Sequence, residues 1–234
     1  MKSVINFLQQ LQANNNREWF HAHKEEYKAA QARFNAFAET MIAQIAQFDP
    51  TIAGLTAKDV TYRLHRDTRF SADKRPYKEH MGMFIVRGGK KSGYSGYYFQ
   101  LGADQSAADF GSFHWDTQHI VAPGHYCIEP KALRILREDI MDGEGDFDKL
   151  VREIPDSRFQ LLRIDTLKRN PKGFPADAPW SEYLRLKSFC LAFAPTTEEV
   201  TAADFPERLA QYFSTTTPFL NYINRAIDFA REEE

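Results

Sequence analysis

The sequence predicts an α+β fold, in which a mainly antiparallel sheet is flanked by a long N-terminal helix and by C-terminal helices. Apolar side chains recur at helical spacing over residues 3–48, short runs rich in β-branched, aromatic and other apolar residues lie between residues 60 and 128, and helical spacing returns over residues 202–231. This order argues against a doubly wound parallel sheet. No linker rich in proline, glycine or serine interrupts the 234 residues, so we expect a single domain over 1–234.

Two helices are expected before residue 50. A short helix follows the capping residue Ser3 and ends at residues 13–16, and a much longer helix begins at the cap Asn16 and ends near Pro50. The apolar face of the long helix consists of Trp19, Phe20, His23, Tyr27, Ala30, Phe34, Phe37, Met41 and Ile45, mostly at intervals of three and four residues. This spacing predicts one continuous helix.

The middle of the chain is expected to form neighbouring strands. Residues rich in strand-forming side chains are 60–64, 81–87, 97–101, 119–122 and 125–128. The gap between Val86 and Tyr97 is too short for a helical crossover, so the pairing is expected to be antiparallel. No regular element is assigned to 102–117.

The remaining elements follow from proline positions and from periodicity. We expect a helix from Pro130, a helix over 147–154, a strand over 161–167, an extended proline-rich loop over 171–179, a helix over 181–186, a buried strand over 188–193, and terminal helices over 202–213 and 218–231. The C-terminal helices lie in a segment, 196–234, in which acidic residues outnumber basic ones.

The composition is that of an ordinary globular protein, with 43% hydrophobic and 26% charged residues. Cys127 and Cys190 lie far apart in apolar runs, which fits reduced thiols better than a disulfide. Asn6 interrupts the first apolar run before a signal region forms, and no run is as long as a membrane span. We therefore expect a cytoplasmic protein without membrane contact.

Charge is distributed unevenly, although the formal net charge is only −2. Between Lys58 and Lys91 the cations are Lys58, Arg63, Arg66, Arg69, Lys74, Arg75, Lys78, Arg87, Lys90 and Lys91, and the acids are Asp59, Asp67, Asp73 and Glu79. Guanidinium and ammonium groups suit phosphate or carboxylate oxygens. The sequence therefore predicts a local anion-binding surface, and docking of the acidic tail 196–234 on the basic segment is the alternative.

Common catalytic and cofactor motifs are absent. Residues 84–91 lack both the first glycine and the Ser/Thr of a phosphate loop, residues 93–97 miss a nucleophile elbow, and residues 143–145 lack the third glycine of a dinucleotide fingerprint. His21 and His23 point about 200° apart on a helix and cannot share an ion from one face. We expect neither a metal site nor a cofactor.

Three cationic segments are the candidates for a binding site. The ligand-binding candidates are Arg63, Arg66, Arg69, Lys74, Tyr77 and Lys78 in the first segment, Lys168 and Lys172 in the proline-rich loop, and Arg17 at the start of the long helix. Asp67 and Asp73 are expected to orient the arginines or to act as a base. The leading hypothesis is that the protein binds a phosphorylated or otherwise anionic small ligand. If the protein is an enzyme, this ligand is its substrate.

Two other interpretations remain open. Alternating arginine and aspartate side chains also form ion-pair networks that only stabilise a fold, with Trp19, Phe70 and Tyr77 as core aromatics. In the second interpretation, the chain is a non-enzymatic interaction domain. Such a domain would bind nucleic acid through the basic segment and Tyr94, Tyr97 and Tyr98, or a protein partner through the acidic tail.

The chain also resembles a known family. The segments that carry the likeness are Asn15-Asn16-x-Glu18-Trp19-Phe20-x-x-His23-Lys24-x-x-Tyr27, Arg63-x-x-Arg66-Asp67-x-Arg69-Phe70-x-x-Asp73-Lys74-x-Pro76-Tyr77-Lys78 and Leu167-Lys168-Arg169-x-Pro171-Lys172-Gly173-Phe174. They are similar to signature segments of the family catalogued as domain of unknown function 2461, over about 4–193. The resemblance implies a single bacterial domain and brings no activity with it. Residues 102–117 are longer than the family pattern.

Overall fold

A computed structural model describes residues 1–103 and 116–232 of the chain. Its helices are α1 (Lys2–Ala13), α2 (Arg17–Ala22), α3 (Lys24–Ile45), the 3-10 turn η1 (Pro50–Ile52), α4 (Ala57–Val60), α5 (Pro130–Asp142), α6 (Asp146–Arg152), α7 (Ser181–Leu184), α8 (Thr197–Thr201), α9 (Phe205–Thr215) and α10 (Thr217–Glu232). Most of the segment 102–117, for which the sequence predicts no element, lies outside the described residues, as do residues 233–234 of the acidic tail.

Two small antiparallel sheets lie at the centre. One has the order β1 (His80–Ile85), β2 (Tyr97–Gly102) and β3 (Ile120–Val121), and the other has the order β4 (Gly124–His125), β6 (Phe189–Ala192) and β5 (Gln160–Leu161). Isolated bridges pair Gly96 with Gly124 and Val121 with Phe193, so the two sheets are continuous at this junction. The fold is α+β, and the prediction of antiparallel pairing is confirmed.

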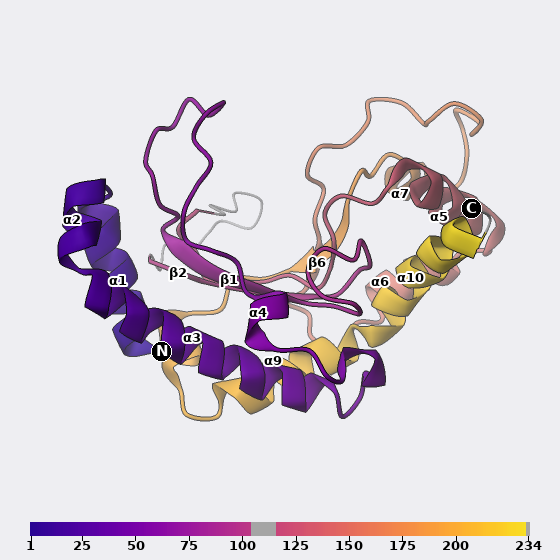
Figure 1. Ribbon diagram of the computed structural model, residues 1–234. Coiled ribbons are helices and arrows are strands. Elements are labelled where there is room, and N and C mark those ends of the chain that lie inside the picture. The colour runs from indigo at the N-terminus through magenta and orange to yellow at the C-terminus, as the bar shows by residue number, and fades with distance from the viewer. Residues whose placement is uncertain (104–115, 233–234) are drawn as a thin grey trace.

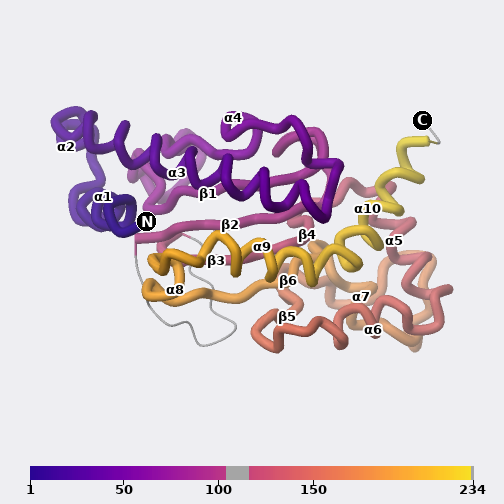
Figure 2. The backbone as a smooth tube through the Cα atoms, turned by 90° about the horizontal axis from the view of Figure 1, so that it is seen from below, coloured from indigo at the N-terminus to yellow at the C-terminus, as the bar shows by residue number. Residues whose placement is uncertain are grey.

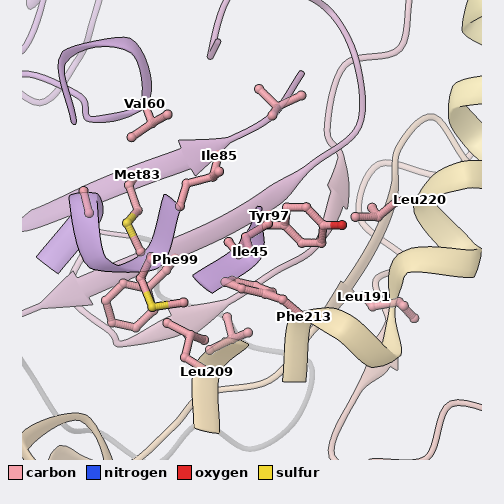
Figure 3. Close-up of a cluster of buried hydrophobic side chains, with 14 of the residues drawn as sticks. Ile45, Val60, Met83, Ile85, Tyr97, Phe99, Leu191, Leu209, Phe213 and Leu220 are labelled. Carbon is pink, nitrogen blue, oxygen red and sulfur yellow. The ribbon is translucent and has the colours of Figure 1, made fainter. Parts of the chain in front are cut away.

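The sheets carry helices on one face and long loops on the other. In Figure 1, α3 and α9 run beneath the sheet, while α5, α6, α7 and α10 gather at the C-terminal end; Figure 2 shows α3 and α9 lying along the strands from below. Side chains from strands and helices meet in this core, including Phe99 of β2, Ile45 of α3 and Phe213 of α9 (Figure 3). One continuous cluster of buried side chains extends from α1 to α10.

The expected long N-terminal helix is divided at His23. Asn16 caps α2 as predicted, since its side chain accepts a hydrogen bond from the backbone of Trp19. The backbone N–H and the ring nitrogen Nδ1 of His23 then both donate to the carbonyl of Trp19, at 3.0 and 2.8 Å. A side chain that takes up a helix carbonyl in this way competes with continued helix, and the chain turns before α3 begins.

The expected strand over 60–64 is wrong. Thr56 and Asp59 form a capping box that favours the short helix α4, and this helix takes in Val60, the first residue of the expected strand. After α4 the chain is extended with only one bridge to β1, between Thr61 and Met83. Leu64 is buried, whereas Tyr62 remains 39% exposed.

Smaller differences concern the second half of the chain. The strand expected over 161–167 is only two residues long and begins at Gln160, and α8 appears where no helix is expected because Thr196 and Glu199 form a second capping box. Other expected elements, including α5, α6, β6, α9 and α10, occur within a few residues of their predicted bounds. Within residues 1–103 and 116–232, no helix has both the length and the apolar character needed to cross a membrane.

Candidate functional site

The basic segment projects from the sheet as a long hairpin-like loop, residues 62–79, which we call the arm (Figure 1). Its two sides are joined by hydrogen bonds from the N–H of Arg66 to the carbonyl of Pro76 and from the N–H of Lys78 to the carbonyl of Leu64, each 2.9 Å long. His65 and Tyr77 are therefore opposite one another, with their side chains on one face of the arm. Because side chains alternate along extended chain, Arg66 and Lys78 lie on the other face.

Asn15 attaches the arm to the α1–α2 connection. Its carboxamide accepts from the N–H of Tyr77 at 3.2 Å and donates to the carbonyl of Tyr77 at 3.0 Å, so it pairs with the backbone as a neighbouring strand would. The same NH₂ group donates to Glu79 at 3.1 Å. Arg75 also donates to Glu79, whose side chain is only 2% exposed. These contacts fix the position of Tyr77.

Asp67 and Asp73 are both engaged by arginines of the arm. Asp73 accepts from Arg75 and Arg66, and Asp67 accepts from Arg69. These hydrogen bonds hold the pKa of each carboxyl below its usual range, through Arg75 first for Asp73 and through Arg69 for Asp67. A carboxylate with a lowered pKa is a weak general base, so the geometry fits the orienting role better than the base role.

Two cations of the arm, Lys78 and Arg63, are not paired with a carboxylate of the described residues. Lys78 is partly buried, its ammonium lies 5.4 Å from the ring centre of Tyr62, and it makes no ion pair with any residue that the structure describes. Burial lowers its pKa, and the charges of Arg63 and Arg66 lower it further. Lys74 donates to the carbonyl of Thr68 at 3.1 Å. Lys78 and Arg63 thus carry positive charge that no described carboxylate pairs.

A cavity opens on the Tyr77 face of the arm. Its volume is about 540 Å³, and its lining residues are Arg17, Phe20, His21, Lys24, Tyr27, His65 and Tyr77. The ring of Phe20 stacks on that of Tyr77, with centroids 3.9 Å apart and an angle of 14° between the planes. Burial raises the pKa of Tyr77, and the charge of Arg17 opposes that rise. Arg17 and Tyr77, from two of the predicted cationic segments, therefore line one cavity.

The third cationic segment lies elsewhere. Lys168 and Lys172 are exposed on the loop between β5 and α7, which rises at the opposite end of the sheet from the arm (Figure 1). Asn170 organises this loop by donating to Pro175 and Ser181 at 2.7 and 2.8 Å. The structure does not bring Lys168 or Lys172 to the cavity.

Two other groups of candidates can be placed. Tyr94 and Tyr97 are buried, and the Tyr94 hydroxyl donates to Asp228 at 2.8 Å. Tyr98 is half-buried on the sheet and donates to Gln100 at 2.7 Å, so these rings offer little surface for base stacking. Across residues 1–103 and 116–232, no three His, Cys, Asp or Glu side chains are grouped so that they could hold a metal ion.

Sequence reasoning missed most of the cavity lining, namely Phe20, His21, Lys24, Tyr27 and His65. Four lining residues recur at close spacing in the sequence, Arg17-x-x-Phe20-His21-x-x-Lys24. The first three, at i, i+3 and i+4, share one side of α2, and Lys24 is the first residue of α3 after the turn at His23. This pattern places two cations and a histidine beside an aromatic ring. This pattern is a local signal for the cavity lining, but the apolar spacing of Phe20 and His23 predicts a core-facing stripe instead.

His80, the first residue of β1 after the arm, is expected to make the stability of the protein depend on pH. Burial lowers its pKa from 6.5 to about 4, although the hydrogen bond to the carbonyl of Asp116 opposes the change. Between pH 6.5 and about 4, His80 is therefore protonated in the unfolded chain but not in the folded chain. The free energy of unfolding is highest above pH 6.5 and decreases as the pH falls towards 4. Because His80 is partly exposed, we expect a loss of about 1–2 kcal/mol.

Urea denaturation at neutral and mildly acidic pH would measure this loss. His80→Asn is the control, because an asparagine NH₂ group can take the place of Nδ1 and still donate to Asp116 without titrating. The wild type should lose more stability than the variant between the two pH values. Equal losses in the wild type and the variant would contradict the prediction, because they would show that protonation of His80 in the unfolded chain does not cause the loss of stability.

Comparison with known proteins gives a family and nothing more specific. The chain matches none of the curated proteins and none of the solved structures. The model of the family described as "Conserved hypothetical protein (DUF2461)" matches residues 3–222. This range includes the arm, the cavity lining and the loop that carries Lys168 and Lys172. The chain therefore belongs to the DUF2461 family.

Proposed function

We propose that the protein binds a small anionic ligand, such as a phosphate ester or a carboxylate, in the cavity between α2, α3 and the arm. The observation that carries the proposal is the chemistry of the lining. It contains four basic side chains, Arg17, His21, Lys24 and His65, and three aromatic rings, but no carboxylate. Guanidinium and ammonium groups in a lining without a carboxylate favour a negatively charged ligand.

Size and charge support the same proposal. A volume of about 540 Å³ is within the range of small-molecule pockets. Neither Arg17 nor Lys24 forms an ion pair within the described part of the chain, so both charges are available to a ligand. The stacked rings of Phe20 and Tyr77 provide an apolar wall. The favoured ligand is therefore an anion that also carries an apolar or planar group.

The residues that line the cavity support binding of the ligand, and they do not include the bases that the sequence predicts for a reaction. Asp67 and Asp73, the expected bases, are held by arginines and do not line it. We therefore propose ligand binding as the function of the cavity.

Replacing Arg17 with alanine tests the proposal. Phenyl phosphate should raise the melting temperature of the wild type more than inorganic phosphate does, because only the ester offers a ring to the apolar wall. Loss of a charge-assisted hydrogen bond from Arg17 should weaken phenyl phosphate binding by about tenfold. Thermal shift at several ligand concentrations, confirmed by calorimetry, measures both effects.

Arg33→Ala is the matched control, since Arg33 is another exposed helical arginine without a described ion pair and lies outside the cavity. Its affinity for phenyl phosphate should equal that of the wild type. Equal weakening in both variants, or no response of the wild type to either compound, would contradict the proposal. Loss of binding in Lys78→Ala but not in Arg17→Ala would move the site to the other face of the arm.

A further inference from the structure

We infer that the tip of the arm and the loop over 162–180, which we call the second loop, form one binding surface for single-stranded nucleic acid. This surface is separate from the cavity, and its occupant is a polymer instead of a small ligand. The inference rests on one exposed ring, on the charges of the two loops, and on their placement on the same side of the sheet.

Phe70 is the most exposed large apolar side chain among the described residues, at 96%. It lies at the tip of the arm, and the guanidinium of Arg69 is 5.8 Å from its ring centre. A single ring next to Ser71 and Ala72 offers too little apolar area for a membrane or for a hydrophobic protein interface. One exposed ring beside cations is, however, what stacking on an unpaired base requires.

Both loops carry an excess of positive charge. The arm contains Arg63, Arg66, Arg69, Lys74, Arg75 and Lys78 against Asp67, Asp73 and Glu79, and the second loop contains Arg163, Lys168, Arg169 and Lys172 against Asp165 and Asp177. In the second loop, Lys168, Arg169 and Lys172 are exposed and form no ion pair within the described part of the chain. These charges are free to contact phosphates.

The placement of the two loops indicates that a partner contacting both of them must be extended. Both rise from the face of the sheet opposite to α3 and α9, and they stand at its two ends (Figure 1). Glu198, Glu199 and Glu207 lie at the starts of α8 and α9, which are on the opposite face of the sheet, the one seen from below in Figure 2. A small anion can contact only one loop, whereas an extended polyanion can contact both. Phosphates at regular spacing with bases free to stack are found in single-stranded nucleic acid.

Fluorescence anisotropy with a labelled oligothymidine long enough to span the sheet would test the inference. Loss of one stacked base in Phe70→Ala should reduce affinity by about tenfold. Lys168→Gln combined with Lys172→Gln should also reduce affinity, and should lower the slope of log affinity against log salt by about 1.4, for two phosphate contacts. Phe70→Trp should keep the affinity, and its fluorescence should be quenched when the oligonucleotide binds.

Matched controls separate stacking and contact from general effects. Phe229→Ala removes another exposed ring, from α10, and Lys2→Gln combined with Lys28→Gln removes the same charge from α1 and α3. Neither should change the affinity, and Arg17→Ala should leave it unchanged because the cavity is a different site. Melting temperatures check that every variant is folded.

Three results would overturn the inference. The first is no binding of oligothymidine by the wild type at low salt. The second is equal losses in Phe70→Ala and Phe229→Ala, or an unchanged affinity in Phe70→Ala. The third is sedimentation of the protein with anionic phospholipid vesicles, dependent on Phe70, without binding of the oligonucleotide.

Discussion

Replacing Gly124 with alanine is expected to lower the free energy of unfolding by about 4 kcal/mol, the largest single effect among the substitutions considered. Gly124 has φ +142°, and a Cβ atom built there would lie 2.2 Å from the carbonyl oxygen of Phe189 and 2.6 Å from the Cα atom of Cys190. Both are backbone atoms of β6 and cannot rotate away. Gly124 also exchanges two hydrogen bonds with Gly96, of 2.8 and 3.1 Å, so a shift of Gly124 away from β6 would also disturb the bridge between the two sheets.

Urea denaturation of Gly124→Ala and of the control Gly173→Ala measures this effect. Gly173 also has a positive φ, +99°, but an added Cβ atom there meets no atom within 4 Å. Its substitution should cost only the backbone strain, about 1 kcal/mol. If the two variants proved equally stable, the close approach of Gly124 to β6 would be excluded as the cause.

Replacing Arg75 with alanine is expected to cost about 2–3 kcal/mol, because it leaves a buried carboxylate without its cation. Glu79 is 2% exposed, and one of its oxygens accepts from both Arg75 and Asn15. The other oxygen, Oε2, is buried without a hydrogen bond among the described residues. After the substitution, the amide of Asn15 would be the one remaining hydrogen-bond donor to Glu79 among the described residues.

A double-mutant cycle by urea denaturation separates the ion pair from packing. Adding Glu79→Gln to Arg75→Ala removes the unpaired charge and should restore part of the stability. Arg69→Ala is the control, because Arg69 also pairs with a carboxylate but both side chains are largely exposed, at 77% and 49%. An exposed pair contributes about 0–1 kcal/mol. Equal losses in Arg69→Ala and Arg75→Ala would show that burial of Glu79 does not decide the effect.

Local patterns in the sequence are enough to predict most of the regular elements. The periodicity of α1, α3 and α10 and the strand composition of β1 and β2 arise from neighbours within a few residues, and these elements occur as expected. The two helices that were not expected, α4 and α8, also have a local signal. Each begins with a capping box, at Thr56 and Asp59 and at Thr196 and Glu199, which is visible in the sequence as a Thr followed three residues later by an acidic residue.

Other features depend on contacts that no local pattern contains. The division between α2 and α3 follows from a side-chain hydrogen bond of His23, whose hydrophobic spacing is compatible with one continuous helix. The cavity exists because Asn15 meets Tyr77, 62 residues further along the chain. The sequence shows that both neighbourhoods are cationic, but it does not show that Arg17 and Tyr77 meet while Lys168 lies at the other end of the sheet.

The pairing of Asn15 with Tyr77 has a further consequence, for solubility. Extended backbone at the side of a projecting loop usually leaves N–H and C=O groups that can recruit a strand from another molecule, and this is a route to aggregation. The N–H and the carbonyl of Tyr77 are both already bonded by the carboxamide of Asn15. One side chain therefore closes this edge of the arm to intermolecular β-pairing, without adding a strand to the fold.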